Sequence, residues 1–131
     1  MTLVVDSSVV VAALVDSGSV GQWAEEVLLS DHLVAPHLMP VEAGNVLRRA
    51  TLAGELSSDV ASIAHVELQT LPVDFFPYGP VASRSWDLRA NVSAYDAWYV
   101  ALAELLDSEL ATLDERLARA PGAACGFLLP P

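Results

Sequence analysis

The sequence predicts an α/β fold, in which a mostly parallel sheet is covered by helices on both faces. Short apolar segments rich in β-branched residues alternate along the chain with segments of helical periodicity. Apolar residues make up 53% of the 131 residues and are spread along the chain, which is enough to bury one core. The alternation contains no internal repeat and no linker. We therefore expect a single domain over residues 1–131 with a parallel central sheet.

Five short segments have the length and composition of buried strands. In chain order they span 3–5, 32–36, 71–77, 108–113 and 125–129. The first of them is apolar and β-branched around Val4, which is typical of a strand covered on both faces. Proline ends the second segment at Pro36 and follows the last one at Pro130, where a strand cannot continue its hydrogen bonding.

The segments between these strands have helical spacing or residues typical of helix ends. In the stretch 20–29, apolar residues recur at helical intervals, at Val20, Trp23, Ala24, Val27 and Leu28. Pro40 stands where a helix begins, and Gly54 stands where the same helix ends. The expected helices span 7–14, 20–29, 41–52, a stretch opened by Ser57, 80 or 81 to 91, 93–106 and 114–120.

The charge and composition of the chain exclude several classes of protein. The formal net charge is −11, all six basic residues are arginines, and there is no lysine. Such a chain does not hold nucleic acid by general attraction to phosphates, although bound divalent cations can reverse the local field. The absence of lysine removes lysine Schiff bases and Walker-type phosphate sites. Cys125 is the only cysteine, so we expect neither an intrachain disulfide nor a thiolate zinc site.

The sequence has no feature of a membrane-bound or secreted protein. No apolar run approaches the length of about 18 residues that spans a bilayer. The N-terminus lacks the basic segment of a secretory signal. We therefore expect a cytoplasmic protein without membrane contact.

Four acidic residues stand where strands end or helices begin. Asp6 and Asp114 follow the first and fourth expected strands, whereas Glu42 and Asp96 lie in the first turns of helices. Many such ends meet at one edge of a parallel α/β sheet, where ligands bind, so we expect the four side chains to converge. Carboxylates brought close together repel one another unless cations lie among them. Oxygen-only ligands favour hard ions, so Mg²⁺ or Mn²⁺ is the expected cofactor.

Each of these acids also has an ordinary structural explanation. Asp6 is placed to cap the helix that follows it, and the two acids in first turns are placed at the positive ends of helix dipoles. Thr112 and Glu115 have the spacing of a capping box, which would leave Asp114 as an ordinary acid of the first turn. Only the convergence of all four would favour a functional site.

Polar neighbours are candidates to support such a site. Ser8 lies two residues after Asp6, and Thr112 precedes the fourth acid by two. Asn45 follows Glu42 by three residues on the same helix face, so it could orient a metal or a phosphate or face solvent. The two serine and threonine hydroxyls could instead cap helices.

Other notable side chains are expected to have structural roles. Arg84 and Arg89 are candidates for phosphate contacts, with solvent-exposed helix charge as the default interpretation. Trp98 and Tyr99 lie on an apolar helix and are expected in the core or in an interface.

Around the four acids the sequence resembles the PIN-domain family, and within it the VapC-type toxins of bacterial toxin–antitoxin pairs. The first acid lies in LVVDSSVVVAAL, which is similar to the family's opening strand. The second lies in MPVEAGNVLRRA, which is similar to the family's second motif, an acid followed three residues later by Asn. The third and fourth motifs resemble SAYDAWYVALAE and LATLDERLARA. The four occur in order over nearly the whole chain.

The resemblance implies a three-layer α/β/α sandwich and the activity of a metal-dependent ribonuclease toxin. It implies a catalytic, metal-binding site made of four acids, Asp6, Glu42, Asp96 and Asp114. Three neighbours would support this site, Ser8, Asn45 and Thr112. The resemblance also implies an RNA substrate, a homodimer, and a cognate antitoxin that holds the toxin inactive.

One position departs from the family pattern. Some members carry a further acid shortly after the fourth, whereas this chain has Arg116 two residues after Asp114. We therefore expect one tightly bound metal and a second that is recruited with the substrate. Two other hypotheses stay open: a non-catalytic protein-binding module of the same fold, and a phosphotransfer protein. The latter normally needs a lysine, which this chain lacks.

Overall fold

The computed structural model describes residues 1–30 and 32–131, and its described strands form one parallel sheet. The strands are β1 (Thr2–Val5), β2 (His32–Pro36), β3 (Val73–Phe76), β4 (Glu109–Ala111) and β5 (Phe127–Leu128). Their order across the sheet is β3-β2-β1-β4-β5. The predicted α/β class with a parallel sheet is therefore confirmed.

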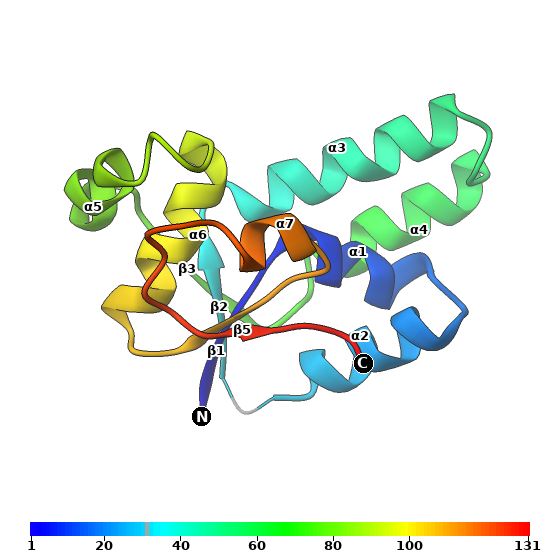
Figure 1. Cartoon of the computed structure of the whole chain (residues 1–131). Coiled ribbons are helices and arrows are strands. Elements are labelled where there is room, and N and C mark those ends of the chain that lie inside the picture. Colours follow the sequence, from blue (N-terminus) through cyan, green and yellow to red (C-terminus); the bar gives the residue numbers. More distant parts are fainter. Residues whose placement is uncertain (31) are drawn as a thin grey trace.

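The helices between the strands complete the alternation. They are α1 (Ser7–Val15), α2 (Ser19–Leu28), α3 (Met39–Leu52), α4 (Ser58–Leu68), the 3-10 turn η1 (Gly79–Val81), α5 (Ala82–Asp87), α6 (Ala94–Leu105) and α7 (Glu115–Ala118). In Figure 1, α5 and α6 lie to the left of the strands, and α1, α2 and α4 lie to the right. The expected three-layer arrangement is confirmed. No helix in the described part of the chain is long and apolar enough to cross a membrane.

The prediction of one helix from residue 80 or 81 to 91 is wrong at its C-terminal end. η1 and α5 take its place, and α5 ends at Asp87. Beyond it, the amide of Asn91 donates to the carbonyl of Leu88, three residues back, which is the bond of a turn rather than of an α-helix. The other expected strands and helices are present, with ends shifted by a few residues.

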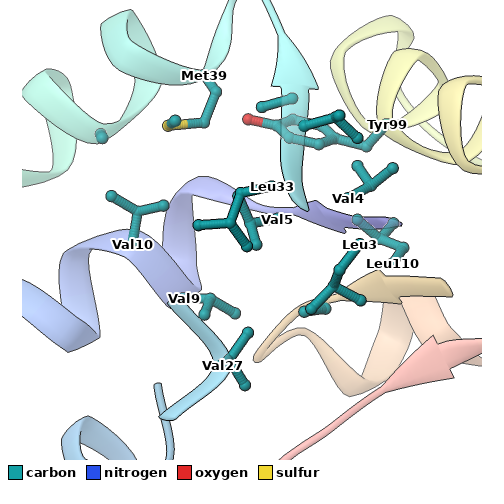
Figure 2. Close-up of a cluster of buried hydrophobic side chains, with 14 of the residues drawn as sticks. Leu3, Val4, Val5, Val9, Val10, Val27, Leu33, Met39, Tyr99 and Leu110 are labelled. Carbon is teal, nitrogen blue, oxygen red and sulfur yellow. The ribbon is translucent and has the colours of Figure 1, made fainter. Parts of the chain in front are cut away.

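β1 lies at the centre of the sheet because its side chains are apolar on both faces. Val4 pairs with Val34 on one side and with Leu110 on the other, and all three are fully buried. Figure 2 shows Val4 and Leu110 in one cluster with Leu33 and with Val9 of α1. A central parallel strand needs this composition, since helices cover it above and below.

The order of the strands places a topological switch point next to β1. From β1 the chain builds outward through β2 and β3, and β4 then returns to the opposite side of β1. Val5 pairs with Ala111, so the residues that follow, Asp6 and Thr112, leave the sheet side by side. The amide of Asp6 donates to the carbonyl of Ala111 at 3.0 Å, which continues the pairing past the strand end. Ligands of open α/β folds bind at such a point.

Candidate functional site

Asp6 lies at the carboxyl end of β1, where three hydroxyl groups hold its carboxylate. Its side chain is only 8% exposed. It accepts hydrogen bonds from Thr112 Oγ1 at 2.7 Å, Ser8 Oγ at 3.0 Å and Ser7 Oγ at 3.4 Å. Asp6 occupies the N-cap position of α1, but its side chain makes no capping hydrogen bond. The interpretation of Asp6 as a helix cap is therefore wrong, and its carboxylate is oriented by side chains instead.

Thr112 and Ser8 connect Asp6 to the turn between β4 and α7. Thr112 Oγ1 donates to Asp6 and accepts from the amide of Asp114 at 3.0 Å. Ser8 Oγ accepts from the amide of Leu113 at 3.1 Å. Thr112 is fully buried, so its bond to Asp6 is shielded from water. The structure thus places both predicted supporting hydroxyls against the first acid.

Asp114 is the N-cap of α7, and the predicted capping box of Thr112 and Glu115 is wrong. One carboxylate oxygen of Asp114, Oδ1, accepts from the amides of Arg116 at 2.9 Å and Leu117 at 3.1 Å. Thr112 is committed to Asp6 because strand pairing brings the two together. The second oxygen of Asp114 has no hydrogen-bond partner in residues 1–30 and 32–131. Capping therefore uses one oxygen and leaves the other available to a ligand.

Glu42, in the first turn of α3, accepts a hydrogen bond from a buried tyrosine on α6. Tyr99 is fully buried, and its Oη donates to Glu42 Oε1 at 2.7 Å. Figure 2 shows the Tyr99 oxygen directed to the side where Met39 begins α3. Burial raises the pKa of Glu42, the Tyr99 hydrogen bond lowers it, and the charges of Asp6 and Asp96 raise it further. Burial also raises the pKa of Tyr99, so this phenol keeps its proton and stays a donor.

Tyr99 is a site residue that sequence reasoning assigned to the core or an interface. The signal that could have found it is its spacing, because it follows Asp96 by three residues and so lies on the same side of α6. Its apolar neighbours hid this signal. In the folded chain, its hydroxyl group reaches across to the acid on α3.

Asp96 lies in the first turn of α6 and interacts electrostatically with the other three acids. Ser93, the N-cap of α6, accepts a hydrogen bond from the Asp96 amide at 3.1 Å, and its hydroxyl group also bonds to the Asp96 side chain, which lines a cavity. Burial raises the pKa of the Asp96 carboxyl group, and the charges of Asp6 and Asp114 raise it further. The structure therefore brings the four predicted acids into one electrostatic group.

The donor set of this group fits a hard divalent cation held in part by water. In the described residues, no carboxylate of the four forms an ion pair, and no three His, Cys, Asp or Glu side chains lie close enough together to hold a metal ion by themselves. Mg²⁺ usually keeps several waters and takes one or two carboxylates together with substrate phosphates, so a closed protein cage is not required. Oxygen donors that raise one another's pKa are stabilised by a cation. Asp6, Asp96 and Asp114 are the candidates to hold it.

Asn45 is the predicted supporting residue that the structure leaves outside this network. It is exposed on α3, one turn after Glu42. Its side chain makes no hydrogen bond with any residue that the structure describes. Its supporting role stays a prediction.

Of the cavities found in the described residues, one is lined by two of the four acids. It has a volume of about 410 Å³ and is lined in part by Asp96 and Asp114. A larger one, of about 580 Å³, is lined by residues that include Leu3, Glu109 and Cys125, and by none of the four acids. The cavity lined by Asp96 and Asp114 is therefore the one that can admit a ligand to the acidic group.

Replacing Tyr99 by phenylalanine is expected to lower any metal-dependent activity of this site about 10-fold, because Glu42 loses the donor that orients it. The free energy of unfolding should fall by only about 1 kcal/mol, since the ring volume is kept and half-buried Glu42 can bond to water. The Tyr99 bond lowers the pKa of Glu42, so its loss should move the acidic limb of the pH–rate profile to higher pH. Tyr95→Phe, an exposed tyrosine on the same helix, is the control. An unchanged profile in Tyr99→Phe would contradict this role.

Comparison with known proteins identifies the class to which this fold and site belong. The family model of the PIN domain matches residues 3–123, and the chain therefore belongs to the PIN-domain family. Within that family it is 43% identical to Ribonuclease VapC1 of Mycobacterium tuberculosis over 127 residues, which are 96% of either chain. The likeness to VapC proteins that the four motifs indicate is thus confirmed.

Solved structures share the fold at low sequence identity. VapBC2 from Rickettsia felis, bound to a DNA fragment from its promoter, matches with a TM-score of 0.69 and 10% identity over 98% of either chain. A toxin–antitoxin complex from Klebsiella pneumoniae matches with a TM-score of 0.65 and 19% identity, also over 98% of either chain. At these identities the likeness concerns the fold alone.

Proposed function

We propose that this protein is an endoribonuclease that depends on Mg²⁺ or Mn²⁺ and acts as the toxin of a toxin–antitoxin pair. What supports the proposal is the placement of the acids around the switch point, where Thr112 links Asp6 to the amide of Asp114, and where burial and neighbouring carboxylates raise the pKa values of Glu42 and Asp96. The named relative with 43% identity is a ribonuclease, which supports the same activity here. An RNA substrate is consistent with action in the cytoplasm.

The residues of the site have separable roles in this proposal. When bound, a divalent cation lowers the pKa of water and neutralises charge at the scissile phosphate. Asp6, Asp96 and Asp114 hold the cation, which also relieves their mutual repulsion. Glu42 orients the attacking water and accepts its proton, a task that its raised pKa favours near neutral pH. Thr112 and Ser8 keep Asp6 in position.

The number of metals in the working site is part of the same proposal. Asp114 keeps one free oxygen, and Arg116 stands where a further acid would extend the ligand set. The acidic group would hold one cation tightly, and a second would be recruited together with the RNA.

The proposed protein partners follow from charge and exposed apolar surface. A chain with a net charge of −11 pairs with a basic antitoxin, whose arginine can enter the acidic site in place of the cation. The relative from Klebsiella pneumoniae is a toxin–antitoxin complex, which supports such a partner. Large apolar side chains are exposed on α3 and α4, at Val41, Leu52, Val60, Ile63 and Val66. This surface supports association with a second copy or an antitoxin.

Cleavage of a mixed-sequence single-stranded RNA tests the proposal. The purified chain, free of copurified partner, is incubated with labelled RNA in Mg²⁺, in Mn²⁺ and in EDTA. We expect cleavage in both metals and none in EDTA. Cleavage that persists in EDTA would contradict the metal-dependent mechanism. Absence of both cleavage and Mn²⁺ binding would favour the non-catalytic binding module.

A further inference from the structure

The six arginines of this chain differ in the contacts that their guanidinium groups make with other residues. Arg84 donates to Glu104 at 2.6 and 3.2 Å and to the carbonyl of Gly122 at 2.7 Å, so the candidate phosphate contact at Arg84 is not supported. Arg89 lies over the Trp86 ring at 4.6 Å and donates to its carbonyl. Arg48 and Arg49 lie on α3. These four do not line the cavity beside the acids.

Arg116 and Arg119 line the cavity that Asp96 and Asp114 also line. The guanidinium group of Arg116 forms no ion pair or hydrogen bond with any described residue. Arg119 makes only a long contact of 3.8 Å with Glu115, and both side chains are more than two-thirds exposed. Such an exposed pair contributes little and can be exchanged for another anion. Two cationic groups are therefore available to a ligand in this cavity.

The other polar lining groups of the cavity suit the same ligand. Asn91 and Ser93 line it together with the arginines. The Ser93 hydroxyl group is engaged by the amide and the side chain of Asp96, so Asn91 supplies the further uncharged donor. Arginine and asparagine donors are among the groups that contact nucleic-acid phosphates. The lining of the cavity thus contains acids together with hydrogen-bond donors that can bind a phosphate.

We infer that Arg116, assisted by Arg119, binds a backbone phosphate of single-stranded RNA adjacent to the phosphate that is cut. This inference rests on the proposed ribonuclease function. A polyanion approaching a chain with a net charge of −11 needs a local positive region to fix its path. Since Asp96 and Asp114 of the proposed cleavage site line the same cavity as the two arginines, a strand whose scissile phosphate lies at the acids would bring a neighbouring phosphate to the arginines. Such a contact sets the position of the strand without reading its sequence.

The test is the cleavage of a fluorescein-labelled single-stranded RNA of mixed sequence in Mn²⁺, measured between about 50 and 200 mM KCl. Arg116→Ala should raise KM about 10-fold with kcat changed less than about twofold. The slope of log(1/KM) against log[KCl] should become shallower by about 1, the value for one lost phosphate contact. Arg116→Lys should keep most of the slope. Arg89→Ala removes an arginine outside the cavity and should match the wild type.

The outcomes separate this inference from the proposed function. If the wild type cleaves RNA and Arg116→Ala matches Arg89→Ala in KM and salt slope, the inference is wrong and the function stands. A loss of kcat at unchanged KM would also overturn it. If the wild type neither cleaves RNA nor binds Mn²⁺, the proposed function fails, and fluorescence anisotropy with the same RNA then tests whether the cavity binds a phosphate. RNA binding that is weakened in Arg116→Ala but not in Arg89→Ala would support the phosphate contact. Equal RNA binding by both variants would contradict it.

Discussion

Replacing Asp96 by asparagine is expected to lower kcat/KM for RNA cleavage at least about 100-fold without loss of the fold. Asparagine has the size of aspartate but is a neutral and weaker metal ligand. Ser93 caps α6 through the backbone amide of residue 96, which the substitution leaves in place. The charges of Asp6 and Asp114 oppose ionisation of Asp96, so its neutralisation should keep or raise the free energy of unfolding of the metal-free protein.

The matched control for this substitution is Asp59→Asn. Asp59 also lies in the first turn of a helix behind a serine N-cap, in this case α4 with Ser57, and it is exposed. If Asp96 only favoured the helix dipole, both variants would lose about 0.3–1 kcal/mol of stability, and neither would lose activity. RNA cleavage and thermal unfolding of both variants distinguish the two roles. An Asp96→Asn variant that cleaves as well as Asp59→Asn would contradict the proposed site.

Replacing Thr112 by valine should affect stability and activity together. The substitution keeps the buried shape but removes the donor to Asp6 and the acceptor of the Asp114 amide. A part-buried amide without its partner and a buried carboxylate with one donor fewer should lower the free energy of unfolding by about 1–3 kcal/mol. Loss of the group that orients a metal ligand should lower kcat/KM about 10- to 100-fold. Urea unfolding and RNA cleavage measure the two effects.

Thr112→Ser and Thr70→Val are the controls for this prediction. Serine keeps the hydroxyl group and should restore most of the activity, at a small cost for the lost methyl group. Thr70 is exposed and bonds only to the carbonyl of Glu67 near the end of α4, so its replacement should change little. If Thr112→Val keeps full activity with normal stability, Thr112 does not orient Asp6.

The sheet and the place of the site could be predicted because they depend on local patterns. The apolar run around Val4 indicates a strand buried on both faces, and acids that directly follow strands lie at the carboxyl edge of a parallel sheet. Asp6 and Asp114 therefore meet near the switch point without any knowledge of side-chain contacts. The strands also alternate with helices regularly enough to define the order of elements.

The partners of the site residues could not be predicted, because they depend on pairing between distant parts of the chain. Thr112 has the local spacing of a helix cap, but the register of Val5 with Ala111 brings it to Asp6 instead. A bond over 106 positions has no local signature. Tyr99 reaches Glu42 only because α6 and α3 are brought together in the fold. In both cases, tertiary contacts override what local spacing indicates.

Titration calorimetry with Mn²⁺ on the purified chain, free of copurified partner, tests the central claim most directly, because it needs no RNA target. The claim is that the carboxylates at the switch point bind a divalent cation together. We expect wild type and Asp59→Asn to bind Mn²⁺ with the same affinity, and Asp96→Asn to bind it at least about 10-fold more weakly. Equal affinities in all three proteins, or no binding by the wild type, would contradict the account.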